Sequence, residues 1–127
     1  MPATAEIGST TWVIAAALIP EWGEGPGAPV ASRETASILN ASEREAHASI
    51  TVFFQNREPI GPYRVTVPAR RAERLCFNDL EKPTPIPHDT QFACLIESDV
   101  PIVVQQTRLD ARRGDAAAIT TIAYSAN

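Results

Sequence analysis

The stretch ASITVFFQ, residues 48–55, decides the fold class of this chain. Successive side chains of an extended strand point to opposite faces, so Ile50, Val52 and Phe54 share one face. Phe53 then lies on the other face. The stretch therefore predicts a β-strand with one apolar, core-facing side and a large aromatic side chain on the opposite side.

Similar short runs rich in Val, Ile, Thr and Phe recur along the chain, bounded by turn residues. In one of them, alternation places Tyr63, Val65 and Val67 on one face. Residues 41–48 are interpreted as a turn or one helical turn, and the Gly- and Pro-rich residues 20–29 and residues 78–90 as loops. Many short strands favour a β-sandwich or barrel. We expect strands at residues 11–19, 34–40, 48–55, 63–67, 74–77, 92–97, 102–109 and 118–124.

The composition is that of one ordinary globular domain. The chain has 127 residues, of which 44% are hydrophobic and 20% are charged, enough for a single core over residues 1–127. Residues 1–10 are expected to form a loose N-terminal tail. The net charge of −4 gives no overall basic field of the kind that attracts nucleic acid or an anionic membrane. Eleven prolines spread along the chain suit many turns between short strands.

The cysteines and the N-terminal apolar run predict a cytoplasmic protein. Cys76 and Cys94 both lie in apolar runs, and we interpret them as small buried hydrophobic residues in a reducing compartment rather than as a disulfide. The apolar run at residues 12–19 has no Lys or Arg before it, unlike a signal peptide. It is also much shorter than the roughly 20 residues that span a bilayer.

Catalytic and metal-binding motifs are missing from the sequence. The two histidines, His47 and His88, and the two cysteines do not have zinc-site spacing. The chain contains no Gly-x-Ser-x-Gly elbow and no P-loop. We therefore expect a non-enzymatic protein without metal or cofactor.

Apolar residues on both faces of some strands predict an oligomer. Phe53 lies opposite the apolar face of its strand, and residues 102–104 are apolar on both sides. A single sandwich leaves its outer faces wet, and no long amphipathic helix is available to cover them. A second subunit is the simplest way to bury these apolar residues. We therefore expect a homo-oligomer whose subunits meet through sheet faces or edges.

The arginines suggest two kinds of contact. Arg70, Arg71 and Arg74 cluster after Pro68 and could contact a nucleic-acid backbone, although solvation at the surface is the default interpretation. Arg108 stands at the polar end of an apolar strand. It either pairs with Asp110 or offers its planar guanidinium to a ligand.

The stretch TPIPHDTQFA, residues 84–93, places a His-Asp pair before a strand. Adjacent extended residues point to opposite sides, so His88 and Asp89 cannot easily act together as base and orienter. Asp89 or Thr90 can instead bond backbone N–H groups of a turn. We expect the His88 ring to face either a pocket or a subunit boundary.

Several strings, in their order along the chain, resemble the sensory rhodopsin transducer family. The resemblance implies a jelly-roll-like antiparallel β-sandwich that assembles as a tetramer, and a cytoplasmic, non-enzymatic protein. It also implies signalling from a membrane rhodopsin, a link to promoter DNA, and small-molecule binding with sugars as suggested ligands. Gln106 stands where the family commonly has a His. The strings are residues 32–35, 38–40, 59–64, 66–71, 77–80, 85–90, 100–105 and 107–110.

Two functions follow from these residues. The first is a binding module for a small polar or sugar-like ligand, because carboxylates, amides and guanidinium groups bond hydroxyls while an aromatic face covers C–H surface. The alternative is an adaptor that contacts a membrane receptor or promoter DNA. A sugar-processing enzyme would need two well-placed acids or a metal. The candidate ligand residues are Trp12, as a stacking surface, with Glu34, Tyr63, Arg64, His88, Asp89, Thr90 and Arg108.

Overall fold

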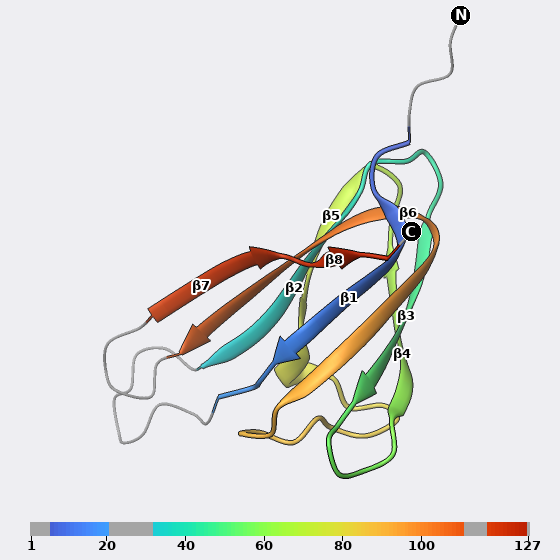
Figure 1. Ribbon diagram of the computed structural model, residues 1–127. Helices are drawn as coiled ribbons and strands as arrows, with labels where there is room; N and C mark the ends of the chain where they lie inside the picture. Colours follow the sequence, from blue (N-terminus) through green and yellow to red (C-terminus); the bar gives the residue numbers. More distant parts are fainter. Residues whose placement is uncertain (1–5, 21–31, 111–116, 127) are drawn as a thin grey trace, which may run out of the picture.

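The computed structural model describes residues 6–20, 32–110 and 117–126, and strands make up most of this part of the chain (Figure 1). A short 3-10 helix, Phe77–Asp79, follows the fifth strand. Every pairing between the strands is antiparallel, which confirms the predicted class. The strands are β1 (Ser9–Ala17), β2 (Arg33–Asn40), β3 (Ala46–Phe53), β4 (Ile60–Val67), β5 (Arg71–Cys76), β6 (Phe92–Asp110), β7 (Ala117–Ile122) and β8 (Tyr124–Ser125).

One long strand, β6, belongs to both sheets of the sandwich. Its first half pairs mainly with β3 and β1, and its second half, from Val103 onward, pairs with β2 and β7. The first sheet therefore has the order β4-β3-β6-β1-β8, and the second has the order β5-β2-β6-β7. Figure 1 shows β6 rising through the first sheet, bending over the top and descending in the second.

The continuity of β6 corrects the prediction of two strands at residues 92–97 and 102–109. Pro101 has no backbone N–H and would interrupt the ladder of a straight central strand. In the structure it lies at the bend, where the register with β1 shifts between Ser9 and Thr11. A strand can turn a corner between two sheets through such a bend, so the chain passes from one sheet to the other without ending the strand.

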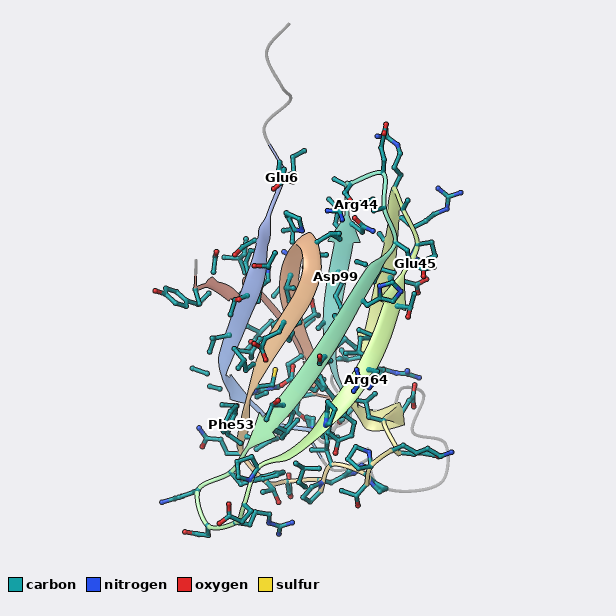
Figure 2. All side chains as sticks on the ribbon, turned by 90° about the vertical axis from the view of Figure 1, so that its right-hand side faces the viewer. Glu6, Arg44, Glu45, Phe53, Arg64 and Asp99 are labelled. Carbon is teal, nitrogen blue, oxygen red and sulfur yellow. The ribbon has the colours of Figure 1, made fainter. Side chains whose placement is uncertain are left out.

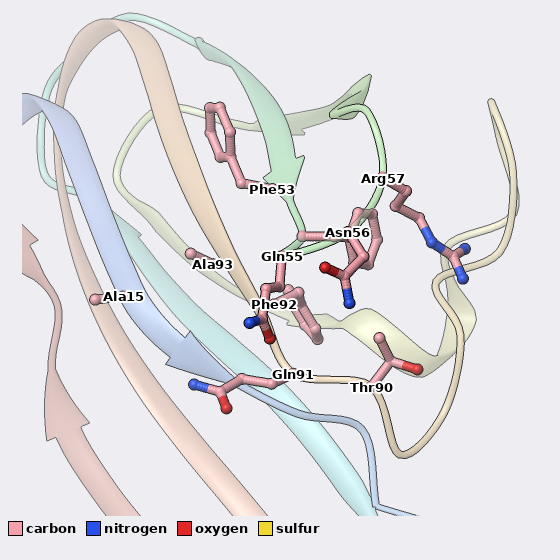
Figure 3. A pocket seen from close by; sticks show the side chains of 10 residues that line it. Ala15, Phe53, Gln55, Asn56, Arg57, Thr90, Gln91, Phe92 and Ala93 are labelled. Atoms are coloured by element: carbon pink, nitrogen blue, oxygen red, sulfur yellow. The ribbon is translucent and has the colours of Figure 1, made fainter.

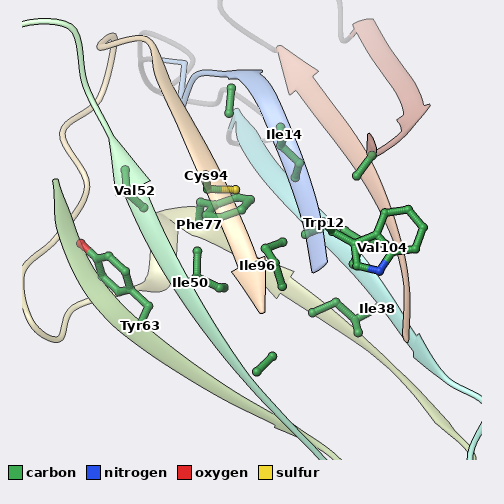
Figure 4. Close-up of a cluster of buried hydrophobic side chains, with 14 of the residues drawn as sticks. Trp12, Ile14, Ile38, Ile50, Val52, Tyr63, Phe77, Cys94, Ile96 and Val104 are labelled. Atoms are coloured by element: carbon green, nitrogen blue, oxygen red, sulfur yellow. The ribbon is translucent and has the colours of Figure 1, made fainter. Parts of the chain in front are cut away.

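The core lies between the two sheets and is built from alternating residues (Figure 4). Along β3, Ala46, Ala48, Ile50 and Val52 are buried while the residues between them are partly or fully exposed. Tyr63 is buried on the neighbouring strand, as its alternation predicts. The inward-facing positions predicted from the sequence are therefore confirmed at Ile50 and Val52 of β3 and at Tyr63 and Val67 of β4, while Phe54 lies just beyond the end of β3 and is half-buried.

The segment between β2 and β3 is a turn, one of the two forms predicted for it. Asn40 is fully buried and its side-chain amide holds this turn. Its Nδ2 donates to the carbonyl oxygens of Arg44 at 2.8 Å and Val67 at 3.1 Å, and its Oδ1 accepts from the N–H of Ser42 at 3.0 Å. These bonds satisfy polar backbone groups that the turn would otherwise leave unpaired.

The N-terminal boundary differs from the prediction. β1 begins at Ser9, so residues 9 and 10 belong to the sheet and not to the expected tail. Gly8 has φ +103°, and a Cβ there would collide with the carbonyl group of Ile102. Glycine is thus required where the chain enters the sheet. The predicted loop at residues 20–29 lies outside the described residues except for Pro20.

Several large apolar side chains lie on the surface of the sandwich. Leu39 is 41% exposed and Phe53 is 40% exposed, while Ile122 and Tyr124 near the C-terminus are more than 60% exposed. Phe53 lies on the outer face of its sheet, as its position in the alternation predicts.

Candidate functional site

An open pocket of about 410 Å³ lies at the end of the sandwich where β3 stops and β6 starts (Figure 3). Its floor is the outer face of three neighbouring strands. Phe53 of β3 lies opposite Ala93 of β6, and Ala15 of β1 flanks Ala93 on the other side. The two alanines leave room beside the phenylalanine ring. We call this the Phe53 pocket, and its lining residues are Ala15, Phe53, Phe54, Gln55, Asn56, Arg57, Thr90, Gln91, Phe92 and Ala93.

The Phe53 pocket combines an aromatic wall with unused amides. The Phe53 ring is 40% exposed, and the Arg57 guanidinium lies 5.1 Å from the centroid of the Phe54 ring. Gln55, Asn56 and Gln91 are exposed, and their side-chain amides bond to no other residue in the described part of the chain. Each amide offers two donors and an acceptor. The pocket therefore presents an apolar face beside several neutral hydrogen-bonding groups.

The turn before β6 carries three of the predicted ligand residues to this end of the molecule. Asp89 has φ +54°, and its backbone N–H donates to the carbonyl oxygen of Ile19 at 2.8 Å, which ties the turn to the end of β1. The Thr90 hydroxyl donates to the carbonyl oxygen of His88 at 3.2 Å, rather than accepting from an N–H as predicted. Of these three residues, Thr90 lines the Phe53 pocket.

Trp12 and Tyr63 lie in the core. The indole N–H of Trp12 donates to the carbonyl oxygens of Ser9 and Ile102, both at 2.9 Å, and the residue is only 5% exposed. The Tyr63 hydroxyl donates to the carbonyl oxygen of Thr84, and burial raises the pKa of this phenol. The proposed stacking role of Trp12 is therefore corrected: its ring has no exposed face, because Trp12 points inward between the sheets.

Glu34 and Arg108 form an ion pair between the paired strands β2 and β6. The Arg108 Nε–H donates to Glu34 Oε2 at 2.9 Å, and the backbone N–H of Leu18 donates to the same oxygen at 2.9 Å. Glu34 is completely buried, the Arg108 side chain is 31% exposed, and Glu34 Oε1 has no hydrogen-bond partner. Arg108 thus pairs with the carboxylate opposite it on β2. This pair lies apart from the Phe53 pocket.

Gln106, which replaces the His expected from the family resemblance, has a structural contact. It is buried, and its Nε2 donates to the carbonyl oxygen of Ala16 at 3.0 Å. The side chain therefore connects β6 with β1 inside the sandwich.

The other predicted arginines do not gather at one surface. Arg70 occupies the turn before β5, where its backbone N–H donates to the Ser42 carbonyl oxygen. Along β5, Arg71 pairs with Asn40 and Arg74 pairs with Ser37. Since these positions differ by three residues, Arg71 and Arg74 point to opposite faces.

Arg64 is exposed on β4, opposite Ser49. It does not line the Phe53 pocket. In Figure 2 it lies on β4, away from Phe53.

The structure also brings together a cluster that the sequence pattern did not indicate. His47 Nδ1 lies 2.8 Å from Asp99 Oδ2, and His47 Nε2 lies 2.9 Å from Glu45 Oε1. The His47 backbone N–H also donates to Asp99 Oδ1 at 2.8 Å. A ring with both nitrogens facing carboxylates donates to both only when it is protonated. Figure 2 shows Glu45 and Asp99 at the end of the molecule remote from Phe53.

We predict that this cluster titrates and makes stability depend on pH. The hydrogen bonds to Asp99 and then Glu45 raise the pKa of His47 above 6.5, and the bonds from His47 lower the pKa of Asp99 below 3.8. A raised histidine pKa gives stability that is lost as pH rises through the folded value; a lowered carboxyl pKa gives stability that is lost as pH falls through it. The contribution is therefore fullest between about pH 4 and 6.5.

NMR titration of the imidazole protons tests this prediction. His47→Gln assigns the signal, because the chain has two histidines, and Asp99→Asn should lower the His47 midpoint. The difference in unfolding free energy between the wild type and His47→Gln should be greatest near pH 5 and should shrink above the midpoint. A difference that stays constant from pH 5 to 9 would contradict the cluster's role.

The buried Cys94 thiol is unsuited to nucleophilic catalysis. Cys76 and Cys94 are both free, and burial raises the pKa of Cys94 to about 12, which keeps it protonated near neutral pH. Cys76 donates weakly to Asn78 Oδ1 at 3.4 Å. Within residues 6–20, 32–110 and 117–126, no three His, Cys, Asp or Glu side chains are placed to hold a metal ion. No helix in these ranges has the length and apolar character needed to cross a membrane.

Comparisons with known proteins found one matching family model and similar solved structures. The family model described as "Anabaena sensory rhodopsin transducer" matches residues 7–125. The solved structure of the Anabaena sensory rhodopsin transducer is 53% identical, covers 80% of this chain and 99% of its own, and has a TM-score of 0.71. The crystal structure of protein 1070 from Thermotoga maritima is 27% identical over 94% of this chain and 96% of its own, with a TM-score of 0.84. No curated protein sequence matches the chain.

Proposed function

Since the chain belongs to the Anabaena sensory rhodopsin transducer family, we propose that it is a non-enzymatic signalling protein that binds a small, sugar-like ligand in the Phe53 pocket. The observation that carries the proposal is the exposed Phe53 ring beside the amides of Gln55, Asn56 and Gln91. The proposed site lies on the outer face of the first sheet. Of the ligand residues predicted from the sequence, Thr90 is the one that lines it.

The chemistry of the pocket suits a neutral polyol. The C–H face of a sugar ring packs against an aromatic ring, and each hydroxyl can both donate to and accept from an amide. None of the described residues that line the pocket is Asp or Glu. Glycoside hydrolysis normally requires a pair of carboxyl groups about the scissile bond, so this lining supports binding without hydrolysis.

A thermal-shift screen with neutral sugars, followed by calorimetric titration, tests the proposal. We expect at least one sugar to raise the melting temperature. Gln91→Ala should weaken its binding by about 3- to 10-fold through the loss of amide hydrogen bonds. Phe53→Ala should weaken it by about 10-fold or more through the loss of ring contact.

Gln105→Ala is the matched control, because Gln105 is an exposed glutamine on the outer face of the other sheet. It should leave sugar binding unchanged. The proposal is wrong if no sugar stabilises the wild type, or if Gln105→Ala weakens binding as much as Gln91→Ala does.

A second proposed function is that of a cytoplasmic adaptor, and it is supported by the family match. In this proposal the protein contacts a membrane rhodopsin or promoter DNA. The sequence clusters Arg70, Arg71 and Arg74, but in the structure they lie on a turn and on two faces of β5. This arrangement gives less support to a continuous row of cations along a DNA backbone than the sequence did.

We further propose that the protein assembles as a homo-oligomer, with a tetramer as the form implied by the family resemblance. Support comes from apolar side chains at the surface outside the Phe53 pocket, including Leu39, Ile122 and Tyr124. Their contact with another copy would remove apolar area from water. Light scattering during chromatography would measure the mass.

A further inference from the structure

Among the residues that the structure describes, those on the outer face of the second sheet carry positive charge and no negative charge. On β2, Glu34, Ala36 and Ile38 point into the core, so the alternate residues Arg33, Thr35 and Ser37 face outward. Strand pairing adds outward neighbours from the adjoining strands. None of those described on this face is Asp or Glu, although the whole chain has a net charge of −4. The outward neighbours are Ala72, Arg74 and Cys76 on β5, Val103, Gln105, Thr107 and Leu109 on β6, and Ala118, Thr120 and Ile122 on β7.

A groove of about 230 Å³ lies on this face, and Arg33 and Arg74 are among its lining residues. Thr35 is 7% exposed although it faces outward, so it lies at the bottom of the groove. Its hydroxyl donates to the carbonyl oxygen of Thr107 at 3.0 Å, which fixes its orientation. Ser37, which also lines the groove, has no side-chain bond to any residue in the described part of the chain, so its hydroxyl is free to donate.

Neither arginine of the groove is neutralised by the described part of the chain. Arg108 is engaged by Glu34, whereas Arg33 and Arg74 form no ion pair or side-chain hydrogen bond with any described residue. A guanidinium offers five N–H donors in a plane and binds phosphate oxygens in pairs. Two such groups and a free hydroxyl, with no carboxylate among the described residues that line the groove, form a site for an anion.

We propose that the groove defined by Arg33, Thr35, Ser37, Arg74 and Thr107 binds the phosphate group of a small metabolite. The site is distinct from the Phe53 pocket, which lies on the outer face of the other sheet, and it does not depend on sugar binding there. A phosphate monoester carries close to two negative charges near neutral pH, which matches the two guanidinium groups.

The geometry favours a small phosphate ester over a nucleic-acid backbone. Backbone binding needs several cations spaced along a track, but Arg71 points to the opposite face from Arg74 and Arg70 occupies the preceding turn. Among the described residues of this face, the arginines are therefore the two that line the groove, Arg33 and Arg74. The net negative charge of the chain also opposes the approach of a polyanion.

Calorimetric titration at low ionic strength tests the proposal with inorganic phosphate, glucose 6-phosphate and glucose. We expect both phosphate compounds to bind to the groove. Arg33→Gln and Arg74→Gln should each weaken phosphate binding by about 10-fold or more, since each removes charge-assisted hydrogen bonds, and the double variant should abolish it. Raising the salt concentration should weaken it as well.

Arg71→Gln is the matched control, because it makes the same charge change on the same strand but on the opposite face. It should leave phosphate binding unchanged, as should Phe53→Ala. Circular dichroism checks that every variant is folded. The proposal is overturned if neither phosphate compound binds, or if Arg71→Gln weakens binding as much as Arg74→Gln. Tight binding of duplex DNA that depends on Arg71 and Arg74 together would also overturn it and would assign the charge to a nucleic-acid backbone.

Discussion

Replacement of Trp12 by alanine is expected to lower the free energy of unfolding by about 3 to 5 kcal/mol, the range found when a large aromatic residue is removed from a core. The residue is 5% exposed, and its indole N–H is shared between the carbonyl oxygens of Ser9 and Ile102. The substitution removes both the buried ring and the link between the start of β1 and β6. Equilibrium unfolding in urea, at constant pH, measures the loss.

Two further variants separate the contributions to this loss. Trp12→Phe keeps an aromatic ring but removes the N–H, and should cost about 1 to 3 kcal/mol because it leaves buried acceptors without their donor. Tyr124→Ala removes an aromatic side chain that is 69% exposed and should change stability by less than about 0.5 kcal/mol. If Trp12→Phe left stability unchanged and weakened ligand binding, Trp12 would be a stacking residue after all.

Local periodicity was sufficient to predict most of the strands. Along β3 and β4 the alternation of apolar residues identified the buried faces, including those of Ile50 and Tyr63, because each strand has one face in the core. It failed at β6, because a strand that bends between two sheets looks locally like two strands around Pro101. The shared strand is a property of the pairing, and only the partners on each side reveal it.

The candidate sites depend on strand order, which local patterns do not contain. Gln55 and Gln91 lie 36 positions apart in the sequence and meet in the Phe53 pocket because the end of β3 adjoins the start of β6. Arg33 and Arg74 likewise share a groove through the pairing of β2 with β5. The residue type alone was misleading for Trp12, because an indole suits both a stacking surface and a core.

The charges at the two ends of the sandwich act differently on stability. Glu45, His47 and Asp99 are exposed, so water screens their interactions. Glu34 is completely buried at the other end, where a charge is costly unless it is paired. The Glu34–Arg108 pair should therefore have the larger effect when one partner is removed.

We expect Arg108→Ala to lower the free energy of unfolding by about 2 to 4 kcal/mol, somewhat below the usual 3 to 5 kcal/mol for breaking a buried ion pair. The expected loss of unfolding free energy is smaller because the Arg108 side chain is 31% exposed, so water partly screens the pair. The variant leaves the Glu34 carboxylate with the Leu18 N–H as its remaining hydrogen-bond donor among the described residues. Urea unfolding at neutral pH measures the loss. Arg64→Ala, an exposed arginine on β4 without an ion-pair partner in the described chain, is the control and should cost less than about 0.5 kcal/mol.

A double-mutant cycle with Glu34→Gln distinguishes loss of pairing from loss of packing. Glutamine keeps an acceptor for the Leu18 N–H but removes the buried charge, so the cost of Arg108→Ala in this background should fall below about 1 kcal/mol. Equal costs in the two backgrounds would show that the Arg108 side chain stabilises the fold by packing alone. Because the pair lies outside the Phe53 pocket, the folded Arg108→Ala variant should bind sugar as the wild type does. If the Arg108→Ala variant instead lost sugar binding without losing stability, Arg108 would be a ligand-binding residue, as its sequence context suggested.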